Sequence, residues 1–335
     1  MKKRLLGKTG IEVTEISFGG LPIQRCNMEE AGVVLHAVLD AGINFIDTAR
    51  AYTDSEAKIG CHLADRRKEY FLASKSMARD RAGMAKDIDL SLAAMKTNYI
   101  DLYQVHNIKG REDLDAVLAP GGALEALKEA QKAGKIGHIG ITGHTISLLI
   151  EGLRTGEFST VQVPFNCIEQ QALEELFPLA KAMNIGRIVM KPLGGGQLEQ
   201  IDLALRFILE HDISTAIPGM DQIEQIQQNA AASEKFRPLS DQERQELLQE
   251  AKILGPNFCR RCGYCMPCAV GIDIPTTFIF HLQYTRYGMK DAISKRYATF
   301  SSKASDCIEC GVCEERCPYD IPIRERMKQI ARELG

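Results

Sequence analysis

The chain has 335 residues, of which 45% are hydrophobic, and its formal net charge is −3 at pH 7. This length exceeds that of one small domain and suits a barrel of ~250 residues with an appended unit, and the hydrophobic content is ordinary for a globular core. The small net charge gives no case for binding nucleic acid or a membrane surface, and with no secretory signal and no apolar run of ~20 residues we expect a cytoplasmic protein.

The first 235 residues alternate between short apolar runs and segments of helical period. Residues 3–5 and 12–14 flank Lys8-Thr-Gly10, which predicts an N-terminal β-hairpin. The expected strands are Glu15–Phe18, Asn44–Ile46, Phe71–Ala73, Leu102–Val105, Ile136–Ile141, Thr160–Val163, Arg187–Met190 and Thr215–Ile217. The clearest expected helices are Glu29–Leu39, Ala123–Ala133, Ala172–Met183 and Gln222–Ala232. Eight strands that alternate with helices predict an α/β fold and favour a (β/α)8 TIM barrel with a parallel sheet.

Four polar residues stand at the ends of three successive expected strands. Asp47 follows the second strand, and Tyr52 comes shortly after it. Lys75 closes the third strand, and His106 closes the fourth. Taken singly, such a tyrosine or histidine is usually a core residue, and such a lysine is usually a solvated cation. Because barrel enzymes place their chemistry at the carboxyl ends of the strands, the four together predict a catalytic site.

These four side chains have complementary chemistry. A phenol is a weak acid, with an ordinary pKa of about 10, and a neighbouring ammonium group favours its phenolate form. Lys75 is the expected ammonium group, and Asp47 is its expected ion-pair partner. Tyr52 can then protonate a carbonyl oxygen as hydride arrives, while His106 donates a hydrogen bond to the same oxygen. The set predicts the interconversion of a carbonyl and an alcohol on a small substrate.

Most of the 11 cysteines lie in two short runs towards the end of the chain. The runs are Cys259-x2-Cys262-x2-Cys265-x2-Cys268 and Cys307-x2-Cys310-x2-Cys313-x3-Cys317-Pro318. The second run has the spacing of a bacterial 4Fe–4S ferredoxin, including the final proline. A structural zinc site needs two separated Cys-x2-Cys pairs, which leaves the third cysteine unexplained, and disulfides are rare in cytoplasmic proteins. We therefore predict two 4Fe–4S clusters in an electron-handling protein.

The two cysteine runs are similar to each other and to the two-cluster ferredoxins. Cys262-Gly-Tyr-Cys265 corresponds to Cys310-Gly-Val-Cys313, which indicates a duplicated cluster-binding unit. In two-cluster ferredoxins the fourth cysteine of each run binds the other cluster. By this resemblance one cluster is held by Cys259, Cys262, Cys265 and Cys317, and the other by Cys268, Cys307, Cys310 and Cys313. The first run departs from the pattern by its shorter spacing before Cys268 and by Ala269 in place of proline. The long segment from Cys268 to Cys307 predicts added helix.

Turn residues divide the chain into parts. Pro238 and Ser240 end the barrel pattern, and Gly255-Pro256 precedes the cysteine runs. We predict a barrel domain at 1–237, a connecting helix within 238–254, and a small α+β ferredoxin-like iron–sulfur domain at 255–335. Within the last domain, residues Ile323–Leu334 have the pattern of an amphipathic helix.

The motifs of the first 237 residues resemble those of the aldo-keto reductase family. The matching segments are Asp47-Thr-Ala-x-x-Tyr52, Ser-Lys75, Val-His106, Gly140-Ile-Thr142 and Pro192-Leu193-Gly194. Together with the cysteine runs, they resemble a subgroup of that family with a C-terminal two-cluster ferredoxin-like domain. The resemblance implies the catalytic tetrad Asp47, Tyr52, Lys75 and His106, and NAD(P)H bound across the barrel rim. No G-x-G-x-x-G follows an expected strand, in agreement with a family that lacks the Rossmann motif.

The same resemblance implies the residues that hold the cofactor. They are Thr142, Gln162, Met190, Lys191, Pro192, Leu193, Gly194, Gly196, Pro218, Gly219, Met220, Gln225 and Asn229. The loop from Ile217 to Met220 lacks the lysine and serine that clasp a 2′-phosphate in the family, and Gln225 stands where an arginine often contacts that group. Loss of these charge-assisted contacts favours NADH over NADPH. In the alternative interpretation, Lys191 serves the pyrophosphate or a flavin.

The role of the clusters stays open at this stage. A hydride carries two electrons and a cluster accepts one at a time, so direct coupling needs an intermediate such as a flavin. The clusters either relay electrons from a partner such as ferredoxin or support an NAD(P)H-dependent barrel structurally. The leading hypothesis is an iron–sulfur aldo-keto reductase-like oxidoreductase. The alternatives are a flavin- or ferredoxin-linked reductase without nicotinamide, and an electron-transfer or scaffold protein with an idle barrel.

Overall fold

The computed structural model describes residues 1–254, 259, 265–285, 288–317 and 321–335. These residues form two compact units, Met1–Leu247 and Leu248–Gly335. Within the described ranges, no helix has the length and apolar character needed to cross a membrane.

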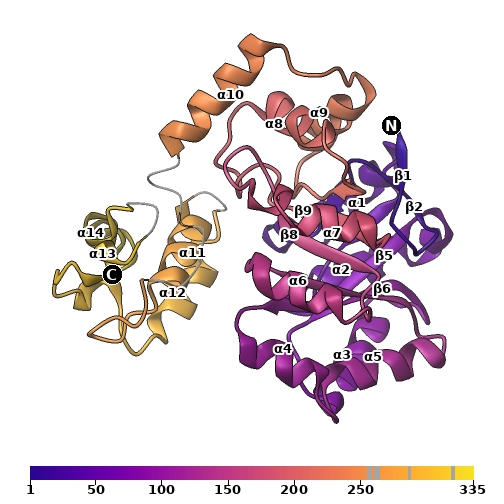
Figure 1. Cartoon of the computed structure of the whole chain (residues 1–335), viewed down its shortest axis with the longest axis horizontal. Coiled ribbons are helices and arrows are strands. Elements are labelled where there is room, and N and C mark those ends of the chain that lie inside the picture. Colours follow the sequence, from indigo (N-terminus) through magenta and orange to yellow (C-terminus); the bar gives the residue numbers. More distant parts are fainter. Residues whose placement is uncertain (255–258, 260–264, 286–287, 318–320) are drawn as a thin grey trace. The chain divides into compact units, whose positions relative to one another are not determined.

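The N-terminal unit is built on a sheet of eight parallel strands (Figure 1). They are β3 (Phe18–Gly19), β4 (Phe45–Asp47), β5 (Phe71–Ser76), β6 (Ile100–Ile108), β7 (Ile136–Gly143), β8 (Thr160–Pro164), β9 (Gly186–Met190) and β10 (Thr215–Ala216). Each strand pairs with the next in chain order. Isolated parallel bridges from Ile16 to Ala216 and from Gly19 to Gly219 join the two edges of the sheet. The curled parallel sheet confirms the barrel predicted from the alternation of strands and helices.

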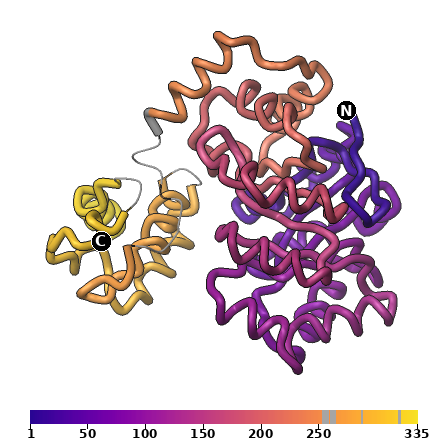
Figure 2. The backbone as a smooth tube through the Cα atoms, viewed as in Figure 1, coloured from indigo at the N-terminus to yellow at the C-terminus, as the bar shows by residue number. Residues whose placement is uncertain are grey.

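Helices connect the strands and enclose them, as the chain trace in Figure 2 shows. They are α1 (Met28–Asp40), α2 (Ser55–Leu63), α3 (Arg81–Ala94), α4 (Arg111–Leu118), α5 (Ala123–Lys132), α6 (Ile146–Arg154), α7 (Leu176–Ala182), α8 (Ile201–Leu209) and α9 (Ile223–Glu234). Helices α1 and α3 begin at side-chain caps. For α1, Asn27 Oδ1 accepts from the main-chain N–H of Glu30, and the Glu30 carboxylate accepts from the N–H of Asn27, which is a capping box.

The predicted N-terminal hairpin covers the amino-terminal end of the barrel. Strands β1 (Lys3–Leu5) and β2 (Glu12–Thr14) pair antiparallel, with Lys3 opposite Thr14. The hairpin turn reaches the start of β9, because Lys8 N–H donates to the Asn184 carbonyl over 2.6 Å. Its buried side chains belong to one core cluster with side chains of the strands: Leu6, Ile11, Val13, Phe45, Ala73, Leu102, Ile188 and Ile217. This end is filled by apolar packing, so the polar side chains of the strands gather at the other end.

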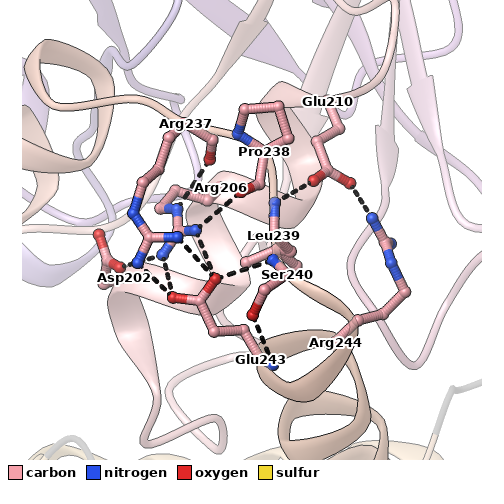
Figure 3. Close-up of polar contacts among 9 residues, drawn as sticks. All are labelled: Asp202, Arg206, Glu210, Arg237, Pro238, Leu239, Ser240, Glu243 and Arg244. Carbon is pink, nitrogen blue, oxygen red and sulfur yellow. Dashed lines mark hydrogen bonds and ion pairs between the residues drawn. The ribbon is translucent and has the colours of Figure 1, made fainter.

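Helix α10 (Asp241–Leu254) begins on the barrel, where an ion network holds it to α8 (Figure 3). Arg206 of α8 is buried and donates to both carboxylate oxygens of Glu243 over 3.0 and 2.9 Å. Arg237 pairs with the same carboxylate, and Ser240 N–H donates to it over 2.9 Å. On the other side of the loop, Arg244 donates to Glu210 over 2.6 Å. The first turn of α10 is therefore fixed to the barrel by charge-assisted hydrogen bonds.

The described residues of the C-terminal unit form helices around a core of their own. They are α11 (Ile274–Thr285), α12 (Lys290–Ala298), α13 (Val312–Glu315) and α14 (Ile323–Leu334). Helices α11 and α12 supply the helix expected between Cys268 and Cys307, and α14 has the predicted bounds. The core contains Phe278, Ile293, Tyr297, Met327 and Ile330. The strands expected for an α+β module are absent from the described part of this unit.

Candidate active site

The four predicted catalytic residues come together at the carboxyl ends of β4, β5 and β6. Asp47 is the last residue of β4, Lys75 is near the end of β5, and His106 lies near the end of β6. Tyr52 lies in the connection between β4 and α2. Because neighbouring parallel strands end at one rim, residues far apart in the sequence meet there.

Asp47 and Lys75 form a buried ion pair. Lys75 Nζ donates to Asp47 Oδ2 over 2.5 Å and to the carbonyl oxygen of Thr48 over 2.8 Å. The side chains are only 1% (Lys75) and 2% (Asp47) exposed. Burial raises the pKa of Asp47, and the attraction of Lys75 opposes this rise. Burial disfavours the charge of Lys75, but the charges and hydrogen bonds of Asp47 and Tyr52 outweigh it and raise the pKa of the ammonium group.

Tyr52 bridges Lys75 and His106. Its ring centroid lies 5.0 Å from Lys75 Nζ and 6.0 Å from the imidazole centroid of His106, in an edge-on arrangement. The loop that carries Tyr52 is tied down on both sides. Ser55 Oγ lies 2.8 Å from Thr48 Oγ1 and donates to the Gly20 carbonyl over 3.0 Å. The phenol is thus held in contact with a cation and a neutral hydrogen-bonding ring.

His106 stays neutral in this environment. Burial lowers its pKa to about 3, and the positive charges of Lys75, Arg79 and Lys109 act in the same direction. Nδ1 of the ring is buried and has no hydrogen-bond partner among the described residues. The next residue, Asn107, has a left-handed φ of 57°, and its N–H donates to Thr142 Oγ1 over 2.7 Å. A neutral imidazole can donate a hydrogen bond without acting as a second acid.

A layer of amides lies beneath the ion pair. Gln104 Nε2 donates to Asp47 Oδ1 over 3.3 Å and to Gln162 Oε1 over 2.9 Å, and Gln162 Nε2 contacts Met190 Sδ at 3.9 Å. The sequence interpretation included Gln162 and Met190 but missed Gln104. The sequence feature that could have identified Gln104 is the two-residue period of a strand, which puts Gln104 and His106 on one face of β6.

The other residues implied for the cofactor lie in the connections after β9 and β10. After β9, Lys191 has φ 55° and Gly194 has φ 58°, and Gly194 N–H donates to the Lys191 carbonyl over 3.0 Å. Pro192, Leu193 and Gly196 belong to this turn. After β10, the Pro218 carbonyl accepts from Gly19 N–H over 2.9 Å. Gly219 and Met220 follow, and both Gln225 and Asn229 lie on α9.

The described cysteines of the second predicted cluster line one cavity. Its volume is about 330 Å³, and its walls include Cys268, Cys307, Cys310 and Cys313. All four are free thiols, as is Cys317, which does not line the cavity. Cys262 and Pro318 lie outside the described residues. Among the described residues, no three His, Cys, Asp or Glu side chains are placed to hold a single metal ion. A 4Fe–4S cluster instead takes four thiolates spread around a larger core, and this donor set fits it.

Known proteins match both parts of the chain. The aldo/keto reductase family model matches residues 15–203, and a 4Fe-4S dicluster domain model matches residues 258–322. The aldo-keto reductase YhdN of Bacillus subtilis is 29% identical over 221 residues, which cover 59% of this chain and 64% of that protein's own length. The 6-dehydroglucose reductase of Novosphingobium aromaticivorans is 28% identical over 256 residues, 68% of this chain and 80% of the relative.

Solved structures agree with this match. The aldo-keto reductase AKR11C1 from Bacillus halodurans, in its holo form, superposes with a TM-score of 0.65 at 26% identity. The superposition covers 75% of this chain and 96% of that protein.

A further sequence relative is the L-galactose dehydrogenase of Arabidopsis thaliana, which is 26% identical over 303 residues, 75% of this chain and 93% of the relative.

Proposed function

Because this chain belongs to the aldo/keto reductase family and carries a 4Fe-4S dicluster domain, we propose that it interconverts a carbonyl group and an alcohol at the barrel rim. One observation carries the proposal. Lys75 is buried between Asp47 and Tyr52 and hydrogen-bonds with both. A buried ammonium group against a phenol stabilises the phenolate that remains after proton donation. No such arrangement is needed to keep a barrel folded, because an apolar pair would pack there without the cost of burying charge.

Each member of the tetrad has a distinct role in this proposal. Tyr52 donates its hydroxyl proton to the carbonyl oxygen during reduction and takes it back during oxidation. Lys75 stabilises the phenolate, and Asp47 holds Lys75 in position. His106 donates a hydrogen bond to the same substrate oxygen and so orients the carbonyl carbon. Because Nδ1 of His106 is buried and unpaired within the described part of the chain, we assign this hydrogen bond to Nε2.

NAD(P)H is the cofactor that we assign to the rim, and it supplies the hydride when bound. Thr142 and Gln162 would hold its carboxamide, Met190 would contact the nicotinamide, and Gln225 and Asn229 would lie on its adenosine side. A carboxylate supports the preference for NADH. The Asp221 main-chain N–H donates to Gln225 Oε1 over 2.8 Å, and the Asp221 carboxylate pairs with Arg25, so this arginine already has an anionic partner. Dissociation constants for NADH and NADPH, measured by nicotinamide fluorescence, test this preference.

We assign one cluster to Cys268, Cys307, Cys310 and Cys313, and the other to Cys259, Cys262, Cys265 and Cys317. The cavity lined by the first four supports this division, because Cys317 does not line it. Two roles for the clusters follow from the chemistry. Either they pass single electrons to or from a redox partner such as ferredoxin through an intermediate acceptor, or they stabilise the C-terminal unit.

An anaerobic assay distinguishes these roles. The purified protein is given NADH, NADPH or reduced ferredoxin with a panel of aldehydes, ketones and sugars, and the clusters are followed by EPR during turnover. Sugars are included because two relatives have names that specify sugar substrates. Carbonyl reduction with a nicotinamide cofactor supports the proposal. Clusters that keep one oxidation state throughout turnover would exclude the relay, and failure to bind either nicotinamide would favour a flavin-linked or idle barrel.

A further inference from the structure

Arg79, in the connection between β5 and α3, contacts the main chain on both sides of the His106–Asn107 peptide bond. One terminal nitrogen of its guanidinium donates to the carbonyl oxygens of His106 and Asn107, both over 2.9 Å. Its Nε donates to Asp113 Oδ1 of α4 over 3.0 Å. The remaining terminal nitrogen is buried and has no hydrogen-bond partner in the described structure. The side chain is only 17% exposed, so its orientation is set by these contacts.

The main chain that Arg79 holds is irregular. The pairing of β6 with β7 shifts register between Val105 and Ile108. Asn107 has a left-handed φ of 57°, a conformation that costs about 1 kcal/mol for a residue with a Cβ. On the β7 side, Thr142 Oγ1 accepts a hydrogen bond from the Asn107 N–H. On the β5 side, Arg79 donates hydrogen bonds to the two carbonyl oxygens. The direction of the His106 side chain therefore depends on contacts from both neighbouring strands.

We propose that Arg79 is a positioning residue of the active site, which fixes the end of β6 so that His106 faces the substrate oxygen. This inference rests on the proposed function of His106. A direct hydrogen-bond partner on the ring would do the same task, but in the part of the chain that the structure describes Nδ1 of His106 has none. The main chain that Arg79 holds is then a route by which the ring is oriented. Arginine suits this task because its planar fork makes several directed hydrogen bonds at once, which the ammonium group of lysine does not.

The charge of Arg79 has a second consequence for His106. Charged and titratable groups near the ring include Tyr52 of the β4–α2 connection, Lys75 of β5, Arg79 and Lys109. Three of them are cations that disfavour a protonated imidazole. Asp113 of α4 accepts from Arg79 and from the Lys109 main chain. Asp113 is held ionised: burial opposes its charge, but hydrogen bonds from Arg79 and the Lys109 main chain lower its pKa. Arg79 thus contributes both to the direction of the ring and to its neutral state.

Three variants of the full-length, anaerobically prepared protein separate these effects. Arg79→Gln removes the charge and the fork, and Arg79→Lys keeps only the charge. Arg81→Gln is the matched control, because Arg81 is exposed on α3 and pairs with Glu129. The readouts are kcat, the KM for cofactor, the pH profile of kcat, and the titration of His106 by NMR on histidine-labelled protein, assigned with His106→Gln.

We expect Arg79→Gln to lower kcat about 10- to 100-fold with little change in the cofactor KM, since misplacement of a reacting group has this cost. We also expect the His106 pKa to rise by about 1 pH unit, the effect of removing one nearby charge. Arg79→Lys should lower kcat and leave the titration unchanged, and the control should change neither. Should Arg79→Gln fail to fold, Asp113→Asn loosens the same arginine and should lower kcat in the same direction.

Wild-type kcat in Arg79→Lys would overturn the positioning role. An unchanged His106 titration in Arg79→Gln would overturn the electrostatic one. The titration is measured without substrate, so it does not depend on the assigned reaction. If Tyr52→Phe keeps full turnover while Arg79→Gln shifts the titration, the proposed chemistry fails and the link between Arg79 and His106 stands.

Discussion

Lys75 is an ammonium group enclosed by the barrel, and its neighbours determine whether it can keep its charge there. Asp47 neutralises it, Gln104 fixes the carboxylate of Asp47, and Tyr52 lies against its other side. A lone buried cation would be expelled or neutralised, so the ion pair is what permits a cation at this depth. The charge of Lys75 is then available to act on the phenol.

Asp47→Asn should destabilise the protein, because it leaves Lys75 buried without a counter-charge. The expected loss is about 3–5 kcal/mol of unfolding free energy. The substitution also changes how the free energy of unfolding depends on pH. The folded-state pKa of Lys75 is raised above its ordinary 10.5, so its stabilising contribution is complete below about pH 10.5 and is lost as pH rises through the folded value. Without Asp47, burial lowers the pKa of Lys75 below 10.5, so the buried charge destabilises the variant at neutral pH and this cost is relieved as pH rises through the variant's folded value.

Anaerobic urea unfolding of wild type and variant between pH 7 and pH 10 measures both effects. Asp89→Asn is the control, since Asp89 pairs with Lys135 on the surface and such pairs contribute about 0–1 kcal/mol. Equal losses in Asp47→Asn and Asp89→Asn would contradict the buried ion pair.

The residue types at the strand ends predicted that these four side chains would lie together, and their catalytic roles stay a prediction. Asp47, Tyr52, Lys75 and His106 are close in space because the barrel brings the ends of β4, β5 and β6 to one rim. Arg79 was not predictable. Its positioning role depends on hydrogen bonds to the carbonyl oxygens of His106 and Asn107. A pattern of side chains in the sequence does not indicate the direction of a main-chain oxygen.

Among the strands, β6 is longer than predicted at both ends. The sequence predicted a strand at Leu102–Val105, whereas β6 extends from Ile100 to Ile108. Its last pair, Ile108 with Gly143, forms only after the register shift that surrounds His106. Apolar periodicity could not predict this extension, because His106 and Asn107 interrupt it. The first expected strand, Glu15–Phe18, is observed as β3 at Phe18–Gly19, and residues 15–17 instead make an isolated parallel bridge to β10 through Ile16 and Ala216.

The ion network that attaches α10 to the barrel leads to a prediction for this helix. Glu243→Gln keeps the shape of the side chain but removes the charge that binds Arg206 and Arg237. Hydrogen bonds from these two arginines lower the pKa of Glu243, so its contribution is present above the ordinary value of 4.5 and is lost as pH falls through the folded value. We expect faster amide hydrogen exchange across residues 239–247 in the variant at neutral pH.

Glu246→Gln is the matched control, because Glu246 is exposed on the same helix and accepts a hydrogen bond from Gln242 over 2.9 Å, outside the ion network. Exchange in Glu243→Gln that equals exchange in this control would show that the ion network does not hold the start of α10.

On the scale of the whole molecule, the chain joins an oxidoreductase barrel to a 4Fe-4S domain, and cysteine spacing was enough to predict the second part. The predicted limits of 1–237, 238–254 and 255–335 stay a prediction, since the two compact units divide between Leu247 and Leu248, within α10. The sequence predicted helix between Cys268 and Cys307 and at Ile323–Leu334, but it also predicted strands, which the described C-terminal residues do not form. Spacing specifies which thiols bind a cluster, but the core around Phe278 and Tyr297 depends on packing that no ligand motif encodes.

Cys310→Ser should remove one cluster and leave the other. Cys310 lines the cavity of the second cluster, so the iron content should fall from about eight to about four per chain. Iron and labile sulfide analysis of anaerobically purified protein measures this change. Cys61→Ser, at an exposed free thiol on α2, should keep the full content. A full complement of iron in Cys310→Ser would contradict the ligand assignment.

The most direct test of the account is the turnover of Tyr52→Phe, which removes one hydroxyl and leaves the ring between Lys75 and His106. The assay is anaerobic carbonyl reduction with the nicotinamide cofactor, with Tyr99→Phe, at a partly exposed tyrosine, as control. We predict that kcat/KM falls about 10²- to 10⁴-fold, the usual contribution of a general acid, while cofactor binding and iron content stay at wild-type levels. Turnover by Tyr52→Phe equal to that of the control would contradict proton transfer by Tyr52, and with it the reaction assigned to this barrel.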